Sequence, residues 1–375
     1  MKIIINSSNL FQGGGIQVAY SFLMESKRYV DNEYHVFLCP KLGDQIDTYS
    51  FPGNYFFYYI PNRPSPITIK GIKTIKTLKS LEKKINPDCV FSVFGPTYWT
   101  PKVPHLMGFA LGHFIYPDSP YFKIIKWKAK IGWNLLGWIK LSYMKKNAQY
   151  YHVETNDAKL RLSRLHSFPA NNIHVLSNTH GAIFEQFIPS KEQILEQRRQ
   201  ENEFRIVCIS SYYKHKNLEI LNKVIPILIN KNLNVVFILT IDNTNFQENF
   251  DDSIKQNIIN VGPIPIKLCP QLYYESDAVF LPSLLEIFSA NYPEAMKMEK
   301  PILTSDLSFA KDICGDAALF FNPLSEMDIA NKIEKLVKDK DLQNRLTVAG
   351  KKRLSLFPTP IKKAQQILEI CQSIM

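Results

Sequence analysis

The chain has 375 residues, more than one ordinary hydrophobic core accommodates and enough for two domains. Hydrophobic residues make up 45% and charged residues 21%, a balance that excludes an intrinsically disordered chain. The net charge of +11 is unevenly distributed: residues 1–190 hold 22 Lys and Arg against 11 Asp and Glu, whereas residues 191–375 hold 23 of each. We therefore expect an acidic partner to meet the first half of the chain.

The six cysteines are scattered, with no CxxC pair and no His/Cys cluster at metal-ligand spacing. Most of them lie inside apolar runs, which predicts buried free thiols in a reducing compartment and no metal site. The apolar run at the N-terminus is too short for a signal peptide. No uninterrupted apolar stretch reaches the ~20 residues that span a bilayer. These features predict a cytoplasmic protein.

The first half contains short apolar runs that alternate with helical patterns. Strands are predicted at residues 2–6, 34–39, 55–60, 88–94, 105–110 and 150–154. This alternation indicates an α/β domain with a mostly parallel sheet. Ligands of such sheets bind beyond the carboxyl ends of the strands. We therefore expect one rim, formed by the loops at residues 13–15, 95–98, 113 and 155–156.

Two features of this rim are candidates for function. The glycine run at residues 13–15 stands between a strand and a helix, where backbone can approach a phosphate or a sugar. Its spacing matches neither GxGxxG nor a Walker loop, so that, taken alone, a flexible turn before a helix is the better explanation. His113 follows an apolar strand and can orient a substrate hydroxyl or take part in acid–base chemistry. A lone histidine there is more often structural, but Asp118 on the same loop favours function.

A basic and aromatic stretch follows at residues 121–146, which contain no acidic residue and three of the four tryptophans. On a membrane-surface helix, tryptophans settle at the headgroup level and lysines meet anionic phosphates. The residues expected at such a surface are Lys123, Lys126, Trp127, Lys130 and Trp133. A core helix with solvated lysines and a nucleic-acid-binding helix are the alternatives. The abundance of Trp and the use of Lys rather than Arg favour the membrane.

The second half repeats this α/β pattern after a charged helical pattern at residues 191–203. Strands are predicted at residues 204–210, 235–241, 258–262, 277–281, 301–304 and 317–321. Two doubly wound domains flanking a cleft are the simplest interpretation. We expect an N-terminal domain at 1–188, a C-terminal domain at 189–357 and a C-terminal helix at 358–375 that packs back on the first domain.

Two loops of the second half carry the chemistry. The loop after its first strand holds Lys214 and Lys216, cations that suit a pyrophosphate. The loop after residues 277–281 carries Glu286, and the following helix carries Glu294. Carboxylates accept hydrogen bonds from hydroxyls, while the free amides of a helix start receive a phosphate. Since both loops follow strands of one parallel sheet, we expect them to face each other and to bind an anion with a polyol, as in a sugar nucleotide.

The pattern Glu286-x7-Glu294, with Phe288 and Pro293 inside it, resembles the retaining GT-B glycosyltransferases of family 4. The resemblance is strongest over residues 204–338 and includes Lys216-Asn217, Thr304-Ser305-Asp306 and the run from Cys314 to Ala318. It implies an α/β fold of the GT-B type, with two Rossmann-like domains, of which the first (1–188) binds the acceptor and the second (189–357) binds the nucleotide sugar. It also implies a metal-independent enzyme that transfers a sugar from a UDP- or GDP-linked donor to a hydroxyl with retention of configuration.

The resemblance also implies roles for single residues. Catalysis would fall to Glu286 at the donor hydroxyls, Lys216 at the leaving diphosphate and His113 at the transferred sugar. Glu294 would hold the ribose. The implied donor-binding set is Gly14, Gly15, Ser211, Lys214, Lys216, Ser283, Glu286, Ile287, Phe288, Ser289 and Glu294. The family often has glycine at the positions of Ile287 and Ser289, and arginine near Ser211 and Tyr212, where we expect Lys214 or His215 to supply the charge.

The implied partners are a nucleotide-sugar donor, a lipid-linked saccharide acceptor and an anionic membrane surface. The implied setting is the synthesis of a surface polysaccharide such as O-antigen or capsule, at the inner face of the cell membrane. Apart from the co-substrate, no cofactor is expected, and no nucleic acid. Two alternatives stay open. One is a sugar-nucleotide 2-epimerase of the same architecture, and the other is a basic nucleic-acid-binding protein, in which Glu286 and Glu294 would have no function.

Overall fold

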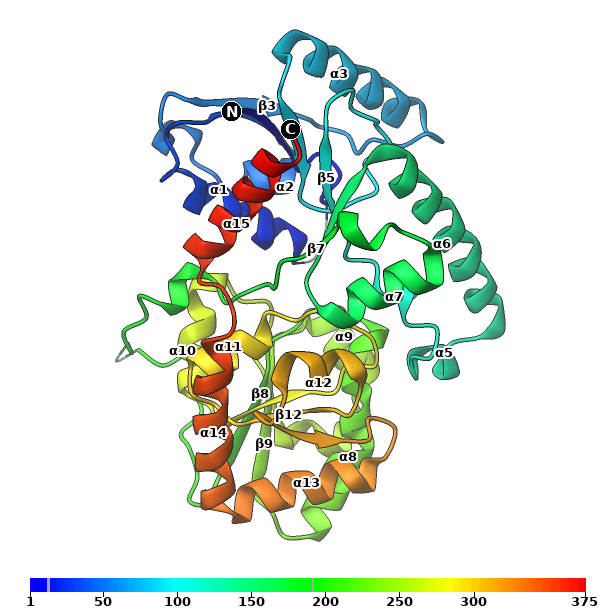
Figure 1. Cartoon of the computed structure of the whole chain (residues 1–375). Coiled ribbons are helices and arrows are strands. Elements are labelled where there is room, and N and C mark those ends of the chain that lie inside the picture. Colours follow the sequence, from blue (N-terminus) through cyan, green and yellow to red (C-terminus); the bar gives the residue numbers. More distant parts are fainter. Residues whose placement is uncertain (12–13, 191) are drawn as a thin grey trace. The chain divides into compact units, whose positions relative to one another are not determined.

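The chain folds into two α/β units in a computed structural model that describes residues 1–11, 14–190 and 192–375 (Figure 1). Unit 1 consists of Met1–Pro117, Ile125–Ser177 and Pro358–Met375, and unit 2 consists of Asp118–Ile124 and Asn178–Phe357. The chain thus leaves unit 1 after Ser177, ahead of the expected boundary at 188–189, and returns to it at Pro358. A short segment, Asp118–Ile124, interrupts unit 1 and belongs to unit 2.

Unit 1 is built on a seven-stranded parallel sheet in the order β3-β2-β1-β4-β5-β6-β7. Its strands are β1 (Lys2–Asn6), β2 (Glu33–Leu38), β3 (Tyr55–Tyr59), β4 (Cys89–Ser92), β5 (His105–Gly108), β6 (Tyr150–Val153) and β7 (Ile173–Val175). The central strand β1 buries apolar residues on both faces, as expected where helices cover both sides. Ile3 and Ile5 join one core cluster, and Ile4 joins another. Unit 1 is therefore doubly wound.

The helices of unit 1 are α1 (Gly15–Ser26), α2 (Pro40–Gly43), α3 (Ile69–Ile85), α4 (Gly112–Ile115), α6 (Trp127–Asn147), α7 (Asn156–His166) and α15 (Pro360–Ser373). Leu78 and Ile85 of α3 pack on the face that carries Ile4. On the opposite face, α1 and α15 pack against Ile3 and Ile5, and α15 contributes Ile367 to that cluster. The C-terminal helix therefore completes the core of the first unit.

Unit 2 contains a six-stranded parallel sheet in the order β10-β9-β8-β11-β12-β13. Its strands are β8 (Phe204–Cys208), β9 (Val235–Leu239), β10 (Ile258–Asn260), β11 (Ala278–Leu281), β12 (Ile302–Ser305) and β13 (Ala318–Phe321). From β8 the chain first builds outward through β9 and β10, and then from β11 in the opposite direction. The topological switch point, where open α/β sheets bind ligands, therefore lies between β8 and β11.

The helices of unit 2 are α5 (Tyr121–Ile124), α8 (Leu221–Asn230), α9 (Asn243–Asn249), α10 (Cys269–Tyr274), α11 (Asn291–Lys297), α12 (Ser308–Cys314), α13 (Glu326–Lys338) and α14 (Lys340–Leu354). The apolar faces of α8 and α13 share one core cluster with β8 and β9. All six cysteines are buried free thiols, as predicted.

The helix predicted at residues 191–203, of which Lys191 lies outside the described residues, is wrong: the remainder of this segment contains no helix. The backbone N–H groups of Ile194 and Leu195 each donate to the carboxylate of Glu275 at 2.9 Å. The Glu275 side chain, at the end of α10, thus satisfies these backbone groups from outside the segment. Charge composition without a buried apolar stripe does not define a helix.

Candidate active site

The loops that follow β8 and β11 lie side by side at the switch point of unit 2. The two strands are hydrogen-bonded neighbours, with Ala278 paired to Ile206 and Val279 to Val207. Beyond the strand ends, the backbone N–H of Leu284 donates to the carbonyl oxygen of His215 at 2.7 Å. The loop at residues 209–217 and the loop at residues 282–290 are therefore joined directly to each other.

An ion pair connects these two loops. The ammonium of Lys216 contacts Oε1 of Glu286, and the hydroxyl of Ser283 donates to the same carboxylate oxygen at 3.2 Å. The side chains of Lys216 and Glu286 are only 19% and 13% exposed. Electrostatic interactions are stronger in such an environment than in bulk water. The structure thus brings three of the residues singled out in the sequence into one cluster of opposite charges.

Lys214 points to a different partner. Its ammonium pairs with Glu219, which also accepts a hydrogen bond from the Tyr212 hydroxyl. The hydrogen bond with Glu219 raises the pKa of the Lys214 ammonium. Lys214 and Lys216 are the first and last residues of a 3₁₀ turn, η4 (Lys214–Lys216), after which Asn217 adopts a left-handed conformation with φ 57°. The turn separates the two lysines, so that Lys216 is the cation of the cluster with Glu286.

His215 is a poor source of the charge that the family's arginine would supply. Burial lowers the pKa of its imidazole, although the Glu286 carboxylate acts in the opposite direction. The neutral ring stacks on Tyr213, with centroids 5.4 Å apart. Ser211, also in the expected donor set, is exposed in the same loop.

The loop that carries Glu286 is held by its apolar side chains. Ile287, where the family often has glycine, is only 5% exposed, so its side chain fills the interior of unit 2. Phe288 packs edge-on against Phe357, with ring centroids 6.0 Å apart. The carbonyl oxygen of Ser289 accepts a hydrogen bond from the N–H of Tyr292 at 3.2 Å. The departure at Ile287 therefore changes the packing beneath the loop.

Glu294 lies on α11 and is buried. Its Oε2 accepts a hydrogen bond from the Tyr273 hydroxyl at 3.0 Å. Burial raises the pKa of the Glu294 carboxyl to about 7, although the bond from Tyr273 works in the opposite direction. At neutral pH the carboxyl is therefore poised between its two protonation states, and in both of them it accepts hydrogen bonds from hydroxyls.

One residue of this region was missed in the sequence. Ser119, from the segment that interrupts unit 1, donates its hydroxyl to the carbonyl oxygen of Leu284 at 2.6 Å. Nothing in the sequence connects Ser119 to a loop 165 residues away, because only the fold brings the two together.

The remaining candidates belong to unit 1. Gly14 and Gly15 begin α1, whereas Gly13 lies outside the described residues. A Cβ on Gly15 would stand 3.2 Å from the Phe94 ring, so close packing accounts for this glycine. His113 lies on α4, where its ring stacks on Trp133 of α6 with centroids 4.2 Å apart. Trp133 is therefore half-buried and supports His113.

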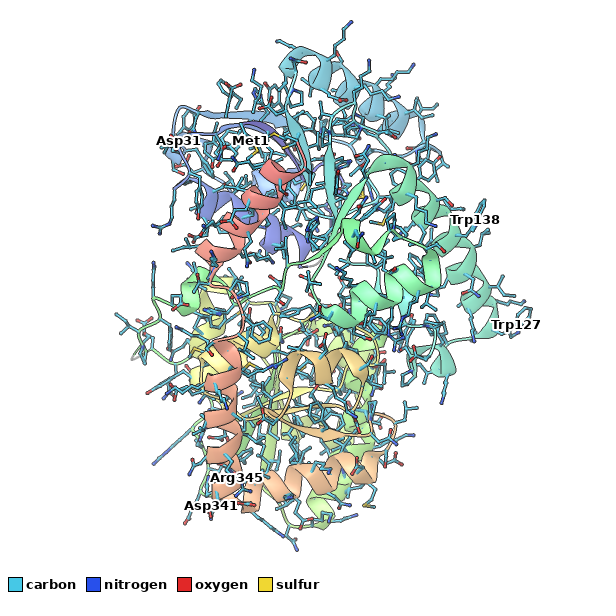
Figure 2. All side chains as sticks on the ribbon, viewed as in Figure 1. Met1, Asp31, Trp127, Trp138, Asp341 and Arg345 are labelled. Atoms are coloured by element: carbon cyan, nitrogen blue, oxygen red, sulfur yellow. The ribbon has the colours of Figure 1, made fainter. Side chains whose placement is uncertain are left out.

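The helix α6 has one packed face and one exposed apolar face. Gly137, Leu141 and Met144 are buried. On the other side, Trp127 and Trp138 are 68% and 70% exposed and project away from the sheet of unit 1 (Figure 2). Lys123, Lys126 and Lys130 are exposed. No helix in the described part of the chain is long and apolar enough to cross a membrane.

Residues 190–353 match the family model described as "Glycosyl transferases group 1". The matched region contains Lys216, Glu286 and Glu294, and with them the switch point of unit 2. No curated protein sequence resembles the chain closely enough to count as a match.

Solved structures match the whole chain. HepE of Anabaena, in complex with UDP-glucose, has a TM-score of 0.74 at 16% identity, with 100% of both chains covered. Sucrose-phosphate synthase of Thermosynechococcus elongatus has a TM-score of 0.73 at 13% identity, with 100% of this chain and 98% of the other covered. WaaG, a glycosyltransferase involved in lipopolysaccharide biosynthesis, has a TM-score of 0.70 at 11% identity, with 98% and 99% covered. These likenesses confirm the expected GT-B architecture.

In residues 1–11, 14–190 and 192–375, no three His, Cys, Asp or Glu side chains are grouped so that they could hold a metal ion.

Proposed function

We propose that this protein is a glycosyltransferase that moves a sugar from a nucleotide diphosphate sugar to a hydroxyl of a saccharide acceptor. The observation that carries the proposal is the cluster of Lys216, Glu286 and Ser283 at the switch point of unit 2. It lies within residues 190–353, which match the group 1 glycosyltransferase model. A cation beside a carboxylate offers one partner to a diphosphate and another to sugar hydroxyls.

In this proposal Lys216 acts on the leaving group. Cleavage of the bond between the sugar and the phosphate leaves negative charge on the nucleoside diphosphate, and a fixed ammonium stabilises that charge as it develops. The diphosphate competes with Glu286 for Lys216, and the carboxylate then accepts hydrogen bonds from sugar hydroxyls. Ser283, which already donates to Glu286 at 3.2 Å, keeps that carboxylate in place during the exchange. Glu294 holds the ribose.

The finer description is part of the same proposal. Retention of configuration, membership of family 4, hexosyl transfer and independence from a metal ion follow from the resemblance of Glu286-x7-Glu294. A UDP-linked sugar is the first donor to test, because HepE, which shares the fold, is seen with UDP-glucose. GDP-linked sugars are the second, and His113 is assigned to the transferred sugar.

We further propose that the acceptor is a lipid-linked saccharide, met at the inner face of the cell membrane in the synthesis of O-antigen or capsule. The exposed apolar face of α6, flanked by lysines, supports this, because tryptophan and lysine together suit an anionic lipid surface. WaaG, with the same architecture, is involved in lipopolysaccharide biosynthesis.

A second helix adds to the cationic surface of unit 1. The exposed lysines of α3 are Lys70, Lys73, Lys76, Lys79, Lys83 and Lys84. Among the described residues, no ion pair involves them. The single acid of α3, Glu82, is buried and accepts a hydrogen bond from the Trp99 indole at 3.0 Å. The exposed charged side chains of α3 are therefore all lysines, and their field favours an anionic surface.

The test is product analysis with UDP- and GDP-sugars and a lipid-linked saccharide acceptor. Wild-type protein should release the nucleoside diphosphate and extend the acceptor, and Lys216→Ala should lose at least about a hundredfold in kcat/KM. Lys231→Ala is the matched control, because Lys231 forms an ion pair of similar burial with Glu334 at 2.6 Å. Full activity of Lys216→Ala would contradict the proposal, and an epimerised sugar nucleotide without transfer would support the 2-epimerase alternative.

A further inference from the structure

Apart from Lys123, which belongs to the proposed membrane surface, the segment Asp118–Ile124 has no task in the proposed function. It belongs to unit 2, although the chain before it and after it belongs to unit 1. Its residues Ser119 and Tyr121 are buried. Because its polar and aromatic side chains are buried, the segment does more than connect two parts of the chain.

The contacts of this segment converge on one peptide of the candidate site. The Ser119 hydroxyl donates to the carbonyl oxygen of Leu284 at 2.6 Å and accepts from the N–H of Tyr121 at 3.1 Å. Both bonds fix the orientation of the hydroxyl. The N–H of Leu284 donates to the carbonyl oxygen of His215 at 2.7 Å. The backbone of Leu284 is thus held on both its polar groups.

The aromatic ring of Tyr121 strengthens the same arrangement. It meets the His215 ring edge-on, with centroids 6.2 Å apart and an interplanar angle of 85°. His215 precedes Lys216, and Leu284 stands between Ser283 and Glu286 in the sequence. Segment 118–124 therefore contacts both loops of the candidate site immediately beside the residues that form the ion pair.

We propose that Ser119 is a positioning residue for the donor site. By holding the carbonyl of Leu284, its hydroxyl sets where the carboxylate of Glu286 lies relative to Lys216. Without this bond the buried carbonyl of Leu284 would lose a hydrogen-bond partner, which is costly, so we expect the loop to change its position.

This inference rests on the proposed function, yet part of its test does not. In Ser119→Ala, amide hydrogen exchange should become about tenfold faster at residues 283–288 and stay unchanged in α13, with no ligand present. Ser276→Ala is the matched control, because it removes a buried hydroxyl bond to the Leu272 carbonyl at 2.8 Å in the same unit. Unchanged exchange at 283–288 in Ser119→Ala would overturn the inference whatever the protein's activity.

The functional arm separates the sugar from the nucleotide. Ser119→Ala should lower kcat/KM for UDP-glucose, or for the sugar nucleotide that wild type uses, about tenfold, whereas the affinity for the bare nucleoside diphosphate should not change. Ser119→Thr, which keeps the hydroxyl, should restore turnover. Two results would show that Ser119 has only a structural role. One is an equal loss of affinity for the diphosphate and of kcat/KM for the sugar nucleotide, and the other is no recovery of turnover in Ser119→Thr. Failure of the wild-type protein to use any nucleotide sugar would count against the proposed function. The hydrogen-exchange result would still show whether Ser119 positions the loop at residues 283–288.

Discussion

Lys216 and Glu286, 70 residues apart in the sequence, form an ion pair across the switch point of the unit 2 sheet. They meet because β8 and β11 are neighbours in that sheet, so that the loops after both strands emerge at the same edge. Neither side chain is more than one-fifth exposed. The pair is therefore both a structural link between the loops and a ready-made pair of partners for an anion and a polyol.

Breaking this pair on one side should destabilise unit 2. Lys216→Met leaves the Glu286 carboxylate partly buried without its counter-ion, which should lower the free energy of unfolding by about 1–3 kcal/mol. The double variant Lys216→Met/Glu286→Gln should recover part of the loss, as a double-mutant cycle in urea would measure. Additive losses would mean that the two groups do not interact in solution. The Lys231–Glu334 pair provides the control cycle.

The buried carboxyl of Glu294 should make stability depend on pH. Its pKa is raised from 4.5 to about 7, so the unfolded chain ionises first. The contribution of Glu294 to stability should be fully present below pH 4.5, be lost as the pH rises through about 7, and then level off at a cost of about 3 kcal/mol relative to Glu294→Gln.

Urea unfolding of wild type and Glu294→Gln between pH 5 and 8 measures this difference. The free energies of unfolding should diverge with rising pH, because Glu294→Gln becomes more stable relative to the wild-type protein. In Tyr273→Phe, which lacks the hydrogen bond to Glu294, the decline should extend above pH 7. Parallel curves for wild type and Glu294→Gln would contradict the raised pKa.

Ile287 should matter for stability and not for donor range. Because its side chain is buried, Ile287→Gly should cost about 3–5 kcal/mol, whereas Ile287→Val should cost about 1 kcal/mol. Thermal unfolding gives the stabilities, and turnover of a panel of nucleotide sugars by the folded protein gives the donor range. A broader donor range without loss of stability would show that Ile287 faces the sugar after all.

The exposed face of α6 should govern attachment to lipid. The triple variant Trp127→Ala/Leu135→Ala/Trp138→Ala should float with anionic phosphatidylglycerol vesicles far less than wild type, since each side chain is exposed. Added salt should weaken the attachment of wild type, because lysines contribute to it. Leu356→Ala, another exposed apolar position, is the control. Equal flotation of the triple variant and wild type would contradict the proposed membrane surface.

The architecture could be predicted from the sequence because apolar runs of strand length alternate with helical patterns in both halves. The same reasoning places the loops of Lys216 and Glu286 at one edge of one sheet. It does not give the strand order, and only the order makes β8 and β11 neighbours. Long-range adjacency of this kind leaves no mark in a single sequence.

The local details that differ depend on conformation. Because of the 3₁₀ turn and the left-handed Asn217, Lys214 pairs with Glu219, five residues later in the chain, and not with Glu286. In the sequence Ile287 stands out only as a departure from the family's glycine, whereas its burial shows that it packs beneath the loop. Ser119 belongs by sequence to the first domain and by packing to the second unit. Each outcome is set by contacts between residues whose meeting only the folded chain determines.

Thermal unfolding with UDP-, GDP- and ADP-sugars tests the central claim most directly, because a ligand that binds only the folded state raises its stability. One nucleotide class should stabilise wild type, by about 2.7 kcal/mol at a hundredfold excess over Kd. Lys216→Met should lose this stabilisation, and Lys231→Met should keep it. No stabilisation of wild type by any nucleotide sugar, or equal stabilisation of Lys216→Met, would contradict a donor site at Lys216 and Glu286.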